Sequence, residues 1–441
     1  MRTTRKPWAV ITAGIAGTAL LAACGGGGST DEGDEPDTGS GGSTPSGEEI
    51  TLTVATFNEF GYEDLIEEYM SLNPGIKVEH RKAATSDEAR DNMNTRIAAG
   101  GAGLADIEAI EVDWLTELMQ YPDQFVDLAD PEVEGRWLDW KVEQATTPDG
   151  KLIGYGTDIG PEGVCYRHDL FEEAGLPTDR EEVAELLGDS WEDYFELGRQ
   201  FVAKSDAAWF DSAGATYQGM VNQIAEPYET ADGTPKPLET NTDIKEMYET
   251  LLAASVDDGL SAGLTQWSED WFAAFQQPKY ATMLCPGWML GIIAGNAAGV
   301  EAWDIADTFP GGGGNWGGSF LTVPAAGDHV EEAKALAKWL TAPEQQIKAF
   351  KAKGTFPSQV EALSSDELLG TTDDFFNGAP TGQILANRAE AVTVSPFKGP
   401  NYFAIHQTVA DAITRVDTDG TDDAASSWQK ALQAYAELGL D

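Results

Sequence analysis

Acidic and aromatic residues are neighbours at several points of the sequence, and this combination suits one kind of ligand. Glu59 is followed by Phe60, and Asp113 is followed by Trp114. A carboxylate accepts hydrogen bonds from hydroxyl groups, and such charge-assisted bonds are stronger than neutral ones. A flat aromatic ring offers a large apolar face to C–H groups at little cost in conformational entropy. These pairs therefore predict a site for a polyhydroxylated ligand such as a sugar.

The second half of the chain supplies further tryptophans, Trp267, Trp271, Trp288 and Trp316. Trp316 lies between glycines, where a main chain without side chains lets a ligand approach closely. The full set of candidate ligand-binding residues is Asn58, Glu59, Phe60, Asp113, Trp114, Asp158, Glu162, Tyr166, Trp271, Trp288, Trp316, Ser319 and Arg388. Each has an alternative role, because a tryptophan more often packs in a core and an acid is more often solvated on the surface.

Patterns typical of catalysis or metal binding are missing from the sequence. The histidines (His80, His168, His329 and His406) are scattered and do not form HExxH or another metal-ligand spacing. Ser319 lacks the second glycine of a GxSxG elbow, and no Gly-Lys-Ser/Thr follows the glycines at 311–314. The acidic turn at 417–420 lacks the terminal glutamate of a calcium loop. We therefore expect a binding protein without catalytic residues, metal or cofactor.

Strand and helix patterns alternate at the start of the folded part, which favours a parallel α/β sheet. The expected strands are residues 50–57, 76–79 and 106–112, with helices expected over 62–69 and 87–99. Ligands of such sheets lie beyond the carboxyl ends of the strands. This rule places two groups of candidates on one rim, namely Asn58, Glu59 and Phe60 after the first strand, and Asp113 and Trp114 after the third.

Length and charge limit the classes of protein that the chain can represent. A chain of 441 residues exceeds the usual size of one hydrophobic core, so two domains or lobes are expected. The formal net charge is −48, from 75 acidic and 27 basic residues. Such a surface repels nucleic acid and anionic lipid headgroups, so neither is an expected partner.

The N-terminus has the pattern of an export signal. Arg2, Arg5 and Lys6 precede an uncharged run that ends at Ala23, and this run is short for a transmembrane helix. Leu21-Ala22-Ala23-Cys24 resembles the lipobox of bacterial lipoproteins, in which the cysteine thiol is lipidated before cleavage. A secretory signal with a chance cysteine is the alternative. Residues 1–23 are then the signal, Cys24 the anchor, and residues 24–48, rich in Gly, Ser and acids, a flexible linker.

Two cysteines remain once Cys24 is assigned to the anchor. Cys165 and Cys285 can pair in only one way, and an oxidising exterior permits the bond. Two buried free thiols are the alternative, and the sequence does not decide between them.

Motifs along the chain resemble those of the extracellular solute-binding proteins of family 1, the sugar-type binding lipoproteins of ABC importers. The stretch from Tyr166 to Pro177, YRHDLFEEAGLP, is similar to the family's entry to its second lobe. The other motifs with this resemblance are NPGIKV (73–78), Trp191, YATMLCPGW (280–288), GGGGNWGGSFLTVP (311–324) and the segment 331–350. Trp316 and Cys285-Pro286-Gly287-Trp288 are also similar to actinobacterial binding proteins for cellobiose and related β-glucosides.

The resemblance implies a two-lobe, periplasmic-binding-protein-like α/β fold with a ligand cleft between lobes that are joined by hinge crossovers. Lobe one is expected to take residues 49–160 and 316–352, and lobe two residues 161–315 and 353–441.

The function implied by the resemblance is capture of an oligosaccharide, such as a β-glucoside, for delivery to an ABC permease. The protein is expected to be a monomer at the outer face of the cytoplasmic membrane, which it contacts only through its lipid anchor. A secreted carbohydrate-active enzyme or adhesin is a second hypothesis. A binding protein for a cationic or peptide solute is a third, because the acidic rim suits a cation.

Overall fold

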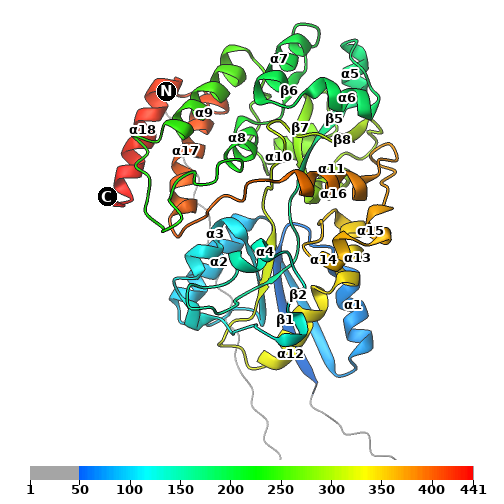
Figure 1. Cartoon of the computed structure of the whole chain (residues 1–441), viewed down its shortest axis with the longest axis vertical. Helices are drawn as coiled ribbons and strands as arrows, with labels where there is room; N and C mark the ends of the chain where they lie inside the picture. Colours follow the sequence, from blue (N-terminus) through cyan, green and yellow to red (C-terminus); the bar gives the residue numbers. More distant parts are fainter. Residues whose placement is uncertain (1–48, 441) are drawn as a thin grey trace, which may run out of the picture. The chain divides into compact units, whose positions relative to one another are not determined.

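The computed structural model describes residues 49–440, and these residues contain two β-sheets with helices packed against them (Figure 1). The expected signal segment 1–23, Cys24 and the expected linker 24–48 lie outside the described residues. Among the helices of residues 49–440, none is both long enough and apolar enough to cross a bilayer.

The first sheet has the strand order β2–β1–β3–β9–β4. Its strands are β1 (Ile50–Phe57), β2 (Ile76–Ala83), β3 (Ile107–Glu111), β4 (Tyr155–Gly156) and β9 (Ser319–Thr322). β1 runs parallel to β2 and β3, which confirms the expected arrangement for these three strands. The rest of the sheet is antiparallel, because β9 returns from the second sheet and pairs antiparallel with both β3 and β4.

Burial of alternate side chains explains why the first strand forms. Leu52 and Val54 alternate with more exposed residues along β1, as expected for a strand with one face in the core. The Thr85 side chain accepts a hydrogen bond from the Glu88 N–H and thereby caps the next helix. The helices of this region are α1 (Glu63–Leu72), α2 (Ser86–Ala98), α3 (Val112–Leu118), α4 (Asp139–Gln144), α12 (Val330–Leu340) and α13 (Pro343–Lys353), with the 3₁₀ turns η1 (Pro122–Gln124) and η2 (Pro131–Val133).

The second sheet has the order β6–β7–β5–β8 and is also mixed. Its strands are β5 (Glu162–Arg167), β6 (Ala208–Phe210), β7 (Tyr280–Pro286) and β8 (Trp303–Ala306). β5 is antiparallel to β7 and β8, whereas β6 is parallel to β7. Successive residues of β5 point to opposite faces. Val164 and Tyr166 therefore belong to one buried cluster and Cys165 to another.

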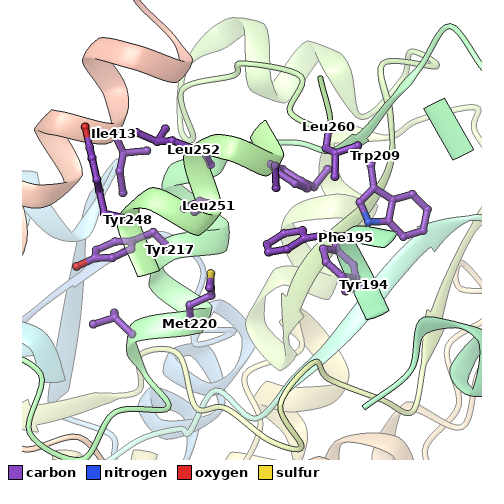
Figure 2. Packing of buried hydrophobic residues seen from close by; sticks show 14 of the residues in the cluster. Tyr194, Phe195, Trp209, Tyr217, Met220, Tyr248, Leu251, Leu252, Leu260 and Ile413 are labelled. Atoms are coloured by element: carbon purple, nitrogen blue, oxygen red, sulfur yellow. The ribbon is translucent and has the colours of Figure 1, made fainter. Parts of the chain in front are cut away.

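The cluster on the Tyr166 face is rich in aromatic residues. Tyr194, Phe195 and Trp209 pack together there, and Tyr217, Tyr248 and Leu251 lie on neighbouring helices (Figure 2). The helices that contribute to this core are α5 (His168–Glu173), α6 (Arg180–Leu187), α7 (Trp191–Val202), α8 (Ala213–Val221), α9 (Thr242–Leu252), the π-helix η3 (Ala253–Asp257), α17 (Tyr402–Asp417) and α18 (Ala424–Glu437).

The cluster on the Cys165 face joins the second sheet to α13. Ile347 and Phe350 of α13 belong to this cluster. Its other helices are α10 (Glu269–Ala274), α11 (Gly287–Asn296), α14 (Val360–Leu363), α15 (Asp366–Leu369) and α16 (Thr381–Ala391).

Two segments that cross between the sheets contact each other. One leads from β4 to β5 and the other from β8 to β9, and Pro161 pairs with Asn315 as an antiparallel bridge. The Trp316 N–H donates a 2.8 Å hydrogen bond to the carbonyl of Gly160. A Cβ atom at position 160 would lie 1.8 Å from the Trp316 carbonyl oxygen, so only glycine fits there.

Cys165 of β5 and Cys285 of β7 are joined by a disulfide bond, with their Cα atoms 5.4 Å apart. The bond links residues 120 positions apart in the sequence. In the chain-entropy model, a loop of this length is worth about 4–5 kcal/mol.

We predict that replacing both cysteines by alanine in residues 49–441 lowers the free energy of unfolding by about 4–5 kcal/mol, because the unfolded chain gains entropy. Denaturant titration of this variant beside the unaltered protein measures the loss. Thiol titration of the unfolded, unreduced protein provides the control and should find no free thiol. Two titratable thiols would contradict the bond.

Candidate functional site

The carboxyl ends of the three parallel strands open on a cavity of about 1100 Å³, a volume that includes the part open to solvent. Asn58, Glu59 and Phe60 line the cavity after β1, and Asp113 and Trp114 line it from the first turn of α3. The strand-end rule thus brings these five predicted residues together.

A third group on the same rim was not predicted from the sequence. Thr85, Ser86 and Asp87 line the cavity directly after β2. The sequence pattern predicted a strand that ends at residue 79, whereas β2 continues to Ala83. The polar residues that follow Ala83 would have been found if the strand had been given its full length.

Tryptophans from three separate segments form another wall. Trp288, at the start of α11, meets the Trp316 ring edge to face, with 5.5 Å between ring centroids. Its Nε1–H donates a 3.0 Å hydrogen bond to the Trp316 carbonyl. Trp267 stacks on Trp288 at 6.0 Å. Phe57, Tyr62 and Phe403 also line the cavity and were not predicted.

One residue of the lining has a strained backbone. Among described residues other than glycine, positive φ angles occur at Asn58 (46°), Trp267 (68°) and Asn377 (55°), and the first two line the cavity. Asparagine adopts such conformations readily, but they are costly for a bulky residue such as Trp267 and are concentrated at functional sites. This strain independently marks the cavity as the candidate site.

Asp158 lies on the segment from β4 to β5, Ser319 is the first residue of β9, and both line the cavity. The Asp158 carboxylate accepts hydrogen bonds from the Ser319 N–H at 2.9 Å and from the Thr157 hydroxyl at 2.7 Å. Burial nevertheless raises the pKa of Asp158, although the nearby Lys141 ammonium opposes this effect.

Glu111, the last residue of β3, also lines the cavity although the sequence did not single it out. Its carboxylate accepts a 2.8 Å hydrogen bond from the Asp113 N–H. Burial and the neighbouring Asp113 carboxylate raise the pKa of Glu111 well above its usual range. A protonated Glu111 can donate a hydrogen bond as well as accept one.

Ion pairs hold two other carboxylates of the lining. Glu59 contacts Lys82 at 2.6 Å and Lys353 at 3.2 Å. Burial alone would raise the pKa of Glu59, but these two lysines outweigh it and the pKa is lowered. Asp113 is paired with the buried Lys398.

Four of the predicted residues lie outside the cavity lining. Tyr166 is buried in the core of the second sheet, where its hydroxyl donates to the Thr178 carbonyl. Trp271 is also buried and donates a 2.8 Å hydrogen bond to Asp211. Arg388 pairs with Asp307 at 2.7 Å. The fourth residue is Glu162.

Glu162 is fully buried, and neither of its carboxylate oxygens has a hydrogen-bond partner among the described residues. A Cβ atom at Gly314 would lie 2.6 Å from Oε2, so Gly314 packs directly against this carboxylate. Burial raises the pKa of Glu162 well above its usual range.

Metal ligands are not grouped in residues 49–440, where no cluster of three or more His, Cys, Asp or Glu side chains has suitable geometry. The cavity instead combines carboxylate acceptors, hydroxyl groups such as that of Ser319, and the side-chain amides of Asn58 and Gln346 with aromatic faces. This composition can hydrogen-bond hydroxyl groups and pack against C–H surfaces at the same time.

Comparison with known proteins gives consistent results. The family model of the bacterial extracellular solute-binding proteins matches residues 64–374. A crystal structure described as an extracellular solute-binding protein of family 1 is 49% identical, with a TM-score of 0.77 over 88% of this chain and 99% of that chain.

Two more distant proteins share the similarity. The ABC transporter associated binding protein from B. animalis subsp. lactis Bl-04, solved with beta-1,6-galactobiose, is 21% identical and has a TM-score of 0.75. That comparison covers 89% of this chain and 99% of the other, and it shows a common fold. The lactose-binding protein of Rhizobium radiobacter is 24% identical over 345 residues, which are 75% of this chain and 79% of the relative.

Proposed function

The chain belongs to the bacterial extracellular solute-binding proteins, and from this premise we propose that it captures an oligosaccharide and delivers it to an ABC import permease without transforming it. The observation that carries the proposal is the composition of the cavity. Carboxylates of Asp113 and Asp158 lie on its lining together with the rings of Trp288 and Trp316. The hydroxyl groups of a sugar can hydrogen-bond the carboxylates, and its C–H patches can pack against the tryptophan rings.

Recognition follows from the positions of these groups. Hydrogen bonds from Ser319 and Thr157 fix the Asp158 carboxylate. Its remaining lone pairs therefore have a fixed direction before the ligand binds. Trp288 is fixed in turn by its hydrogen bond to the Trp316 carbonyl. Groups that are ordered before binding cost less entropy when the ligand arrives.

Closure of two lobes around the ligand is the proposed conformational change, because periplasmic binding proteins close about a hinge when they bind. We assign residues 49–160 and 316–352 to lobe one, and residues 161–315 and 353–441 to lobe two. The contact between Gly160 and Trp316 lies where the chain passes between them. The ligand favours the closed state because it contacts groups of both lobes at once.

The ligand that we propose is a β-linked oligosaccharide such as a β-glucoside. Support comes from the similarity of Trp316 and the Cys285–Trp288 stretch to cellobiose-binding proteins. Two proteins similar to this chain bind lactose and beta-1,6-galactobiose, which are both β-linked disaccharides.

The proposed protein is a monomer that Cys24 anchors to the outer face of the cytoplasmic membrane, with residues 25–48 as a tether. Replacing Cys24 by alanine in the producing cell should move the protein from the membrane fraction to the medium, because no acyl chain is attached. Fractionation and immunoblotting measure this release. A variant that stays in the membrane fraction as firmly as the unaltered protein would contradict lipid anchoring at Cys24.

A thermal-shift screen of residues 49–441 tests the proposed function. Cellobiose, lactose, maltose, xylobiose, trehalose and their monomers are the ligands, and peptides and spermidine are the controls. A ligand that binds only the folded state raises the melting temperature once its concentration exceeds its dissociation constant. We expect a shift with a β-linked disaccharide and no turnover of it. Hydrolysis of the sugar, or a shift with spermidine alone, would contradict the proposal.

Trp288→Ala should weaken binding of that sugar at least roughly tenfold, which corresponds to about 1.4 kcal/mol, because the sugar loses its aromatic contact. Calorimetric titration measures the change. Trp339→Ala is a matched control, because Trp339 packs on Tyr69 with 5.2 Å between ring centroids and does not line the cavity. The control should lose stability and keep its affinity. Equal loss of affinity in both variants would show that Trp288 acts through the fold.

A further inference from the structure

The cavity lining contains acidic side chains but no basic ones. Within the described part of the chain, five carboxylates line the cavity, those of Glu59, Asp87, Glu111, Asp113 and Asp158, and no Lys, Arg or His does. Together with the net charge of −48, this lining suggests at first a site for a cation. The residues directly behind the lining lead to a different conclusion.

Glu59 is neutralised from behind by two lysines. Lys82 lies at 2.6 Å and Lys353 at 3.2 Å, and neither lysine lines the cavity. Both lysines are about one-third exposed, so they approach the carboxylate from the solvent side of the wall.

Asp113 is neutralised by Lys398, whose side chain is only 5% exposed. Lys398 belongs to the segment before α17, and the Gly399 carbonyl next to it accepts a 2.9 Å hydrogen bond from the Thr116 hydroxyl of α3. This contact holds Lys398 behind the part of the cavity lining that follows β3. The Lys398 ammonium also lies 5.0 Å from the centre of the Tyr402 ring. Its positive charge acts on Glu111 as well as on Asp113.

A fourth lysine, Lys141, lies next to Asp158. The side chain is buried, and its ammonium group has no hydrogen-bond partner among the described residues. It lies 3.8 Å from the centre of the Phe320 ring. A Cβ atom at Gly318, which lines the cavity, would lie 2.9 Å from Lys141 Nζ, so the ammonium packs closely against this glycine of the lining.

Burial of a lysine without a hydrogen-bond partner is costly, and here a compensating charge explains it. Burial lowers the pKa of Lys141 to about 7, while the Asp158 and Glu111 carboxylates oppose this effect. Burial and the Asp113 carboxylate raise the pKa of Glu111, so this residue binds a proton more readily than usual. Three of the other lining carboxylates, those of Glu59, Asp113 and Asp158, have a lysine beside them.

We infer that Lys82, Lys353, Lys398 and Lys141 determine the charge that the site accepts, so that it binds uncharged sugars and excludes sugars and other solutes that carry an amine. The inference rests on the proposed function and specifies its ligand class. Because the lysines already offset the charges of Glu59, Asp113 and Asp158, an incoming ammonium gains little attraction there and still loses its hydration. A hydroxyl group loses much less hydration free energy than an ammonium and can use the free lone pairs of the same carboxylates.

The test compares pairs of ligands in which an amino group replaces one hydroxyl group of the sugar. The probes are cellobiose and lactose, their analogues with a 2-amino group on the reducing glucose, and spermidine. Calorimetric titration of residues 49–441 should give an affinity for one neutral disaccharide at least roughly tenfold above that for its amine analogue, or about 1.4 kcal/mol. Spermidine should not bind.

Lys398→Met removes one positive charge behind the wall. The ratio of neutral to amine affinity should fall at least roughly tenfold, because Asp113 becomes available to the ammonium. Lys338→Met is the matched control, since Lys338 pairs with Asp130 and Glu132 away from the cavity and should leave the ratio unchanged. If Lys398→Met does not fold, the double variant Lys82→Met/Lys353→Met gives the same comparison at Glu59, because both lysines are partly exposed.

Equal or tighter binding of the amine analogue by the unaltered protein would overturn the inference and leave sugar binding intact. An unchanged affinity ratio in a folded variant that lacks these lysines would also overturn it. Spermidine binding without any sugar binding, or no binding of any probe, would overturn the proposed function together with the inference.

Discussion

The hydrogen bond from the Trp316 N–H to the Gly160 carbonyl, 2.8 Å long, is the contact on which the rest of the site depends. It joins the two segments that cross between the sheets at a point where a side chain on residue 160 would collide with the main chain of Trp316. The position of Trp316 then fixes Trp288, whose indole N–H donates to the carbonyl of the same residue. Asp158 lies two residues before Gly160 and accepts from the backbone of Ser319, three residues after Trp316. The contact that joins the two crossing segments therefore also positions the acidic and aromatic groups of the site.

Charge is the second constraint. A chain with 75 acidic and 27 basic residues has few cations to place, yet four lysines lie behind one cavity wall. Carboxylates that are removed from water need opposite charges or hydrogen bonds nearby, because burial otherwise favours their protonated form. Where the lysine is close, as at Glu59, the carboxylate keeps a low pKa. Where no ion pair forms, as at Glu111, the pKa rises. The wall is acidic in composition, but the groups behind it offset its charge.

Local patterns in the sequence were sufficient to predict the first three strands and the residues that follow β1 and β3, because alternation and turn residues act over short distances. Contacts between distant segments were not predictable in this way. Lys398 meets Asp113 across 285 positions, and Lys141 meets the wall only because Gly318 has no side chain. Glu162 begins β5, where Gly314 covers its carboxylate, and Trp271 turns its indole toward the buried Asp211. Burial of these two residues depends on packing between elements, which one sequence does not reveal.

A crystal structure of residues 49–441 with the disaccharide that most stabilises the protein would test the proposed binding mode most directly. We predict a sugar ring against Trp288 or Trp316, hydroxyl groups within hydrogen-bond distance of Asp113 and Asp158, and no ligand atom in contact with Lys82, Lys353 or Lys398. A disaccharide bound elsewhere, such as the polar hollow lined by Lys351 and Asp374, with the tryptophan-lined cavity left empty, would contradict this binding mode.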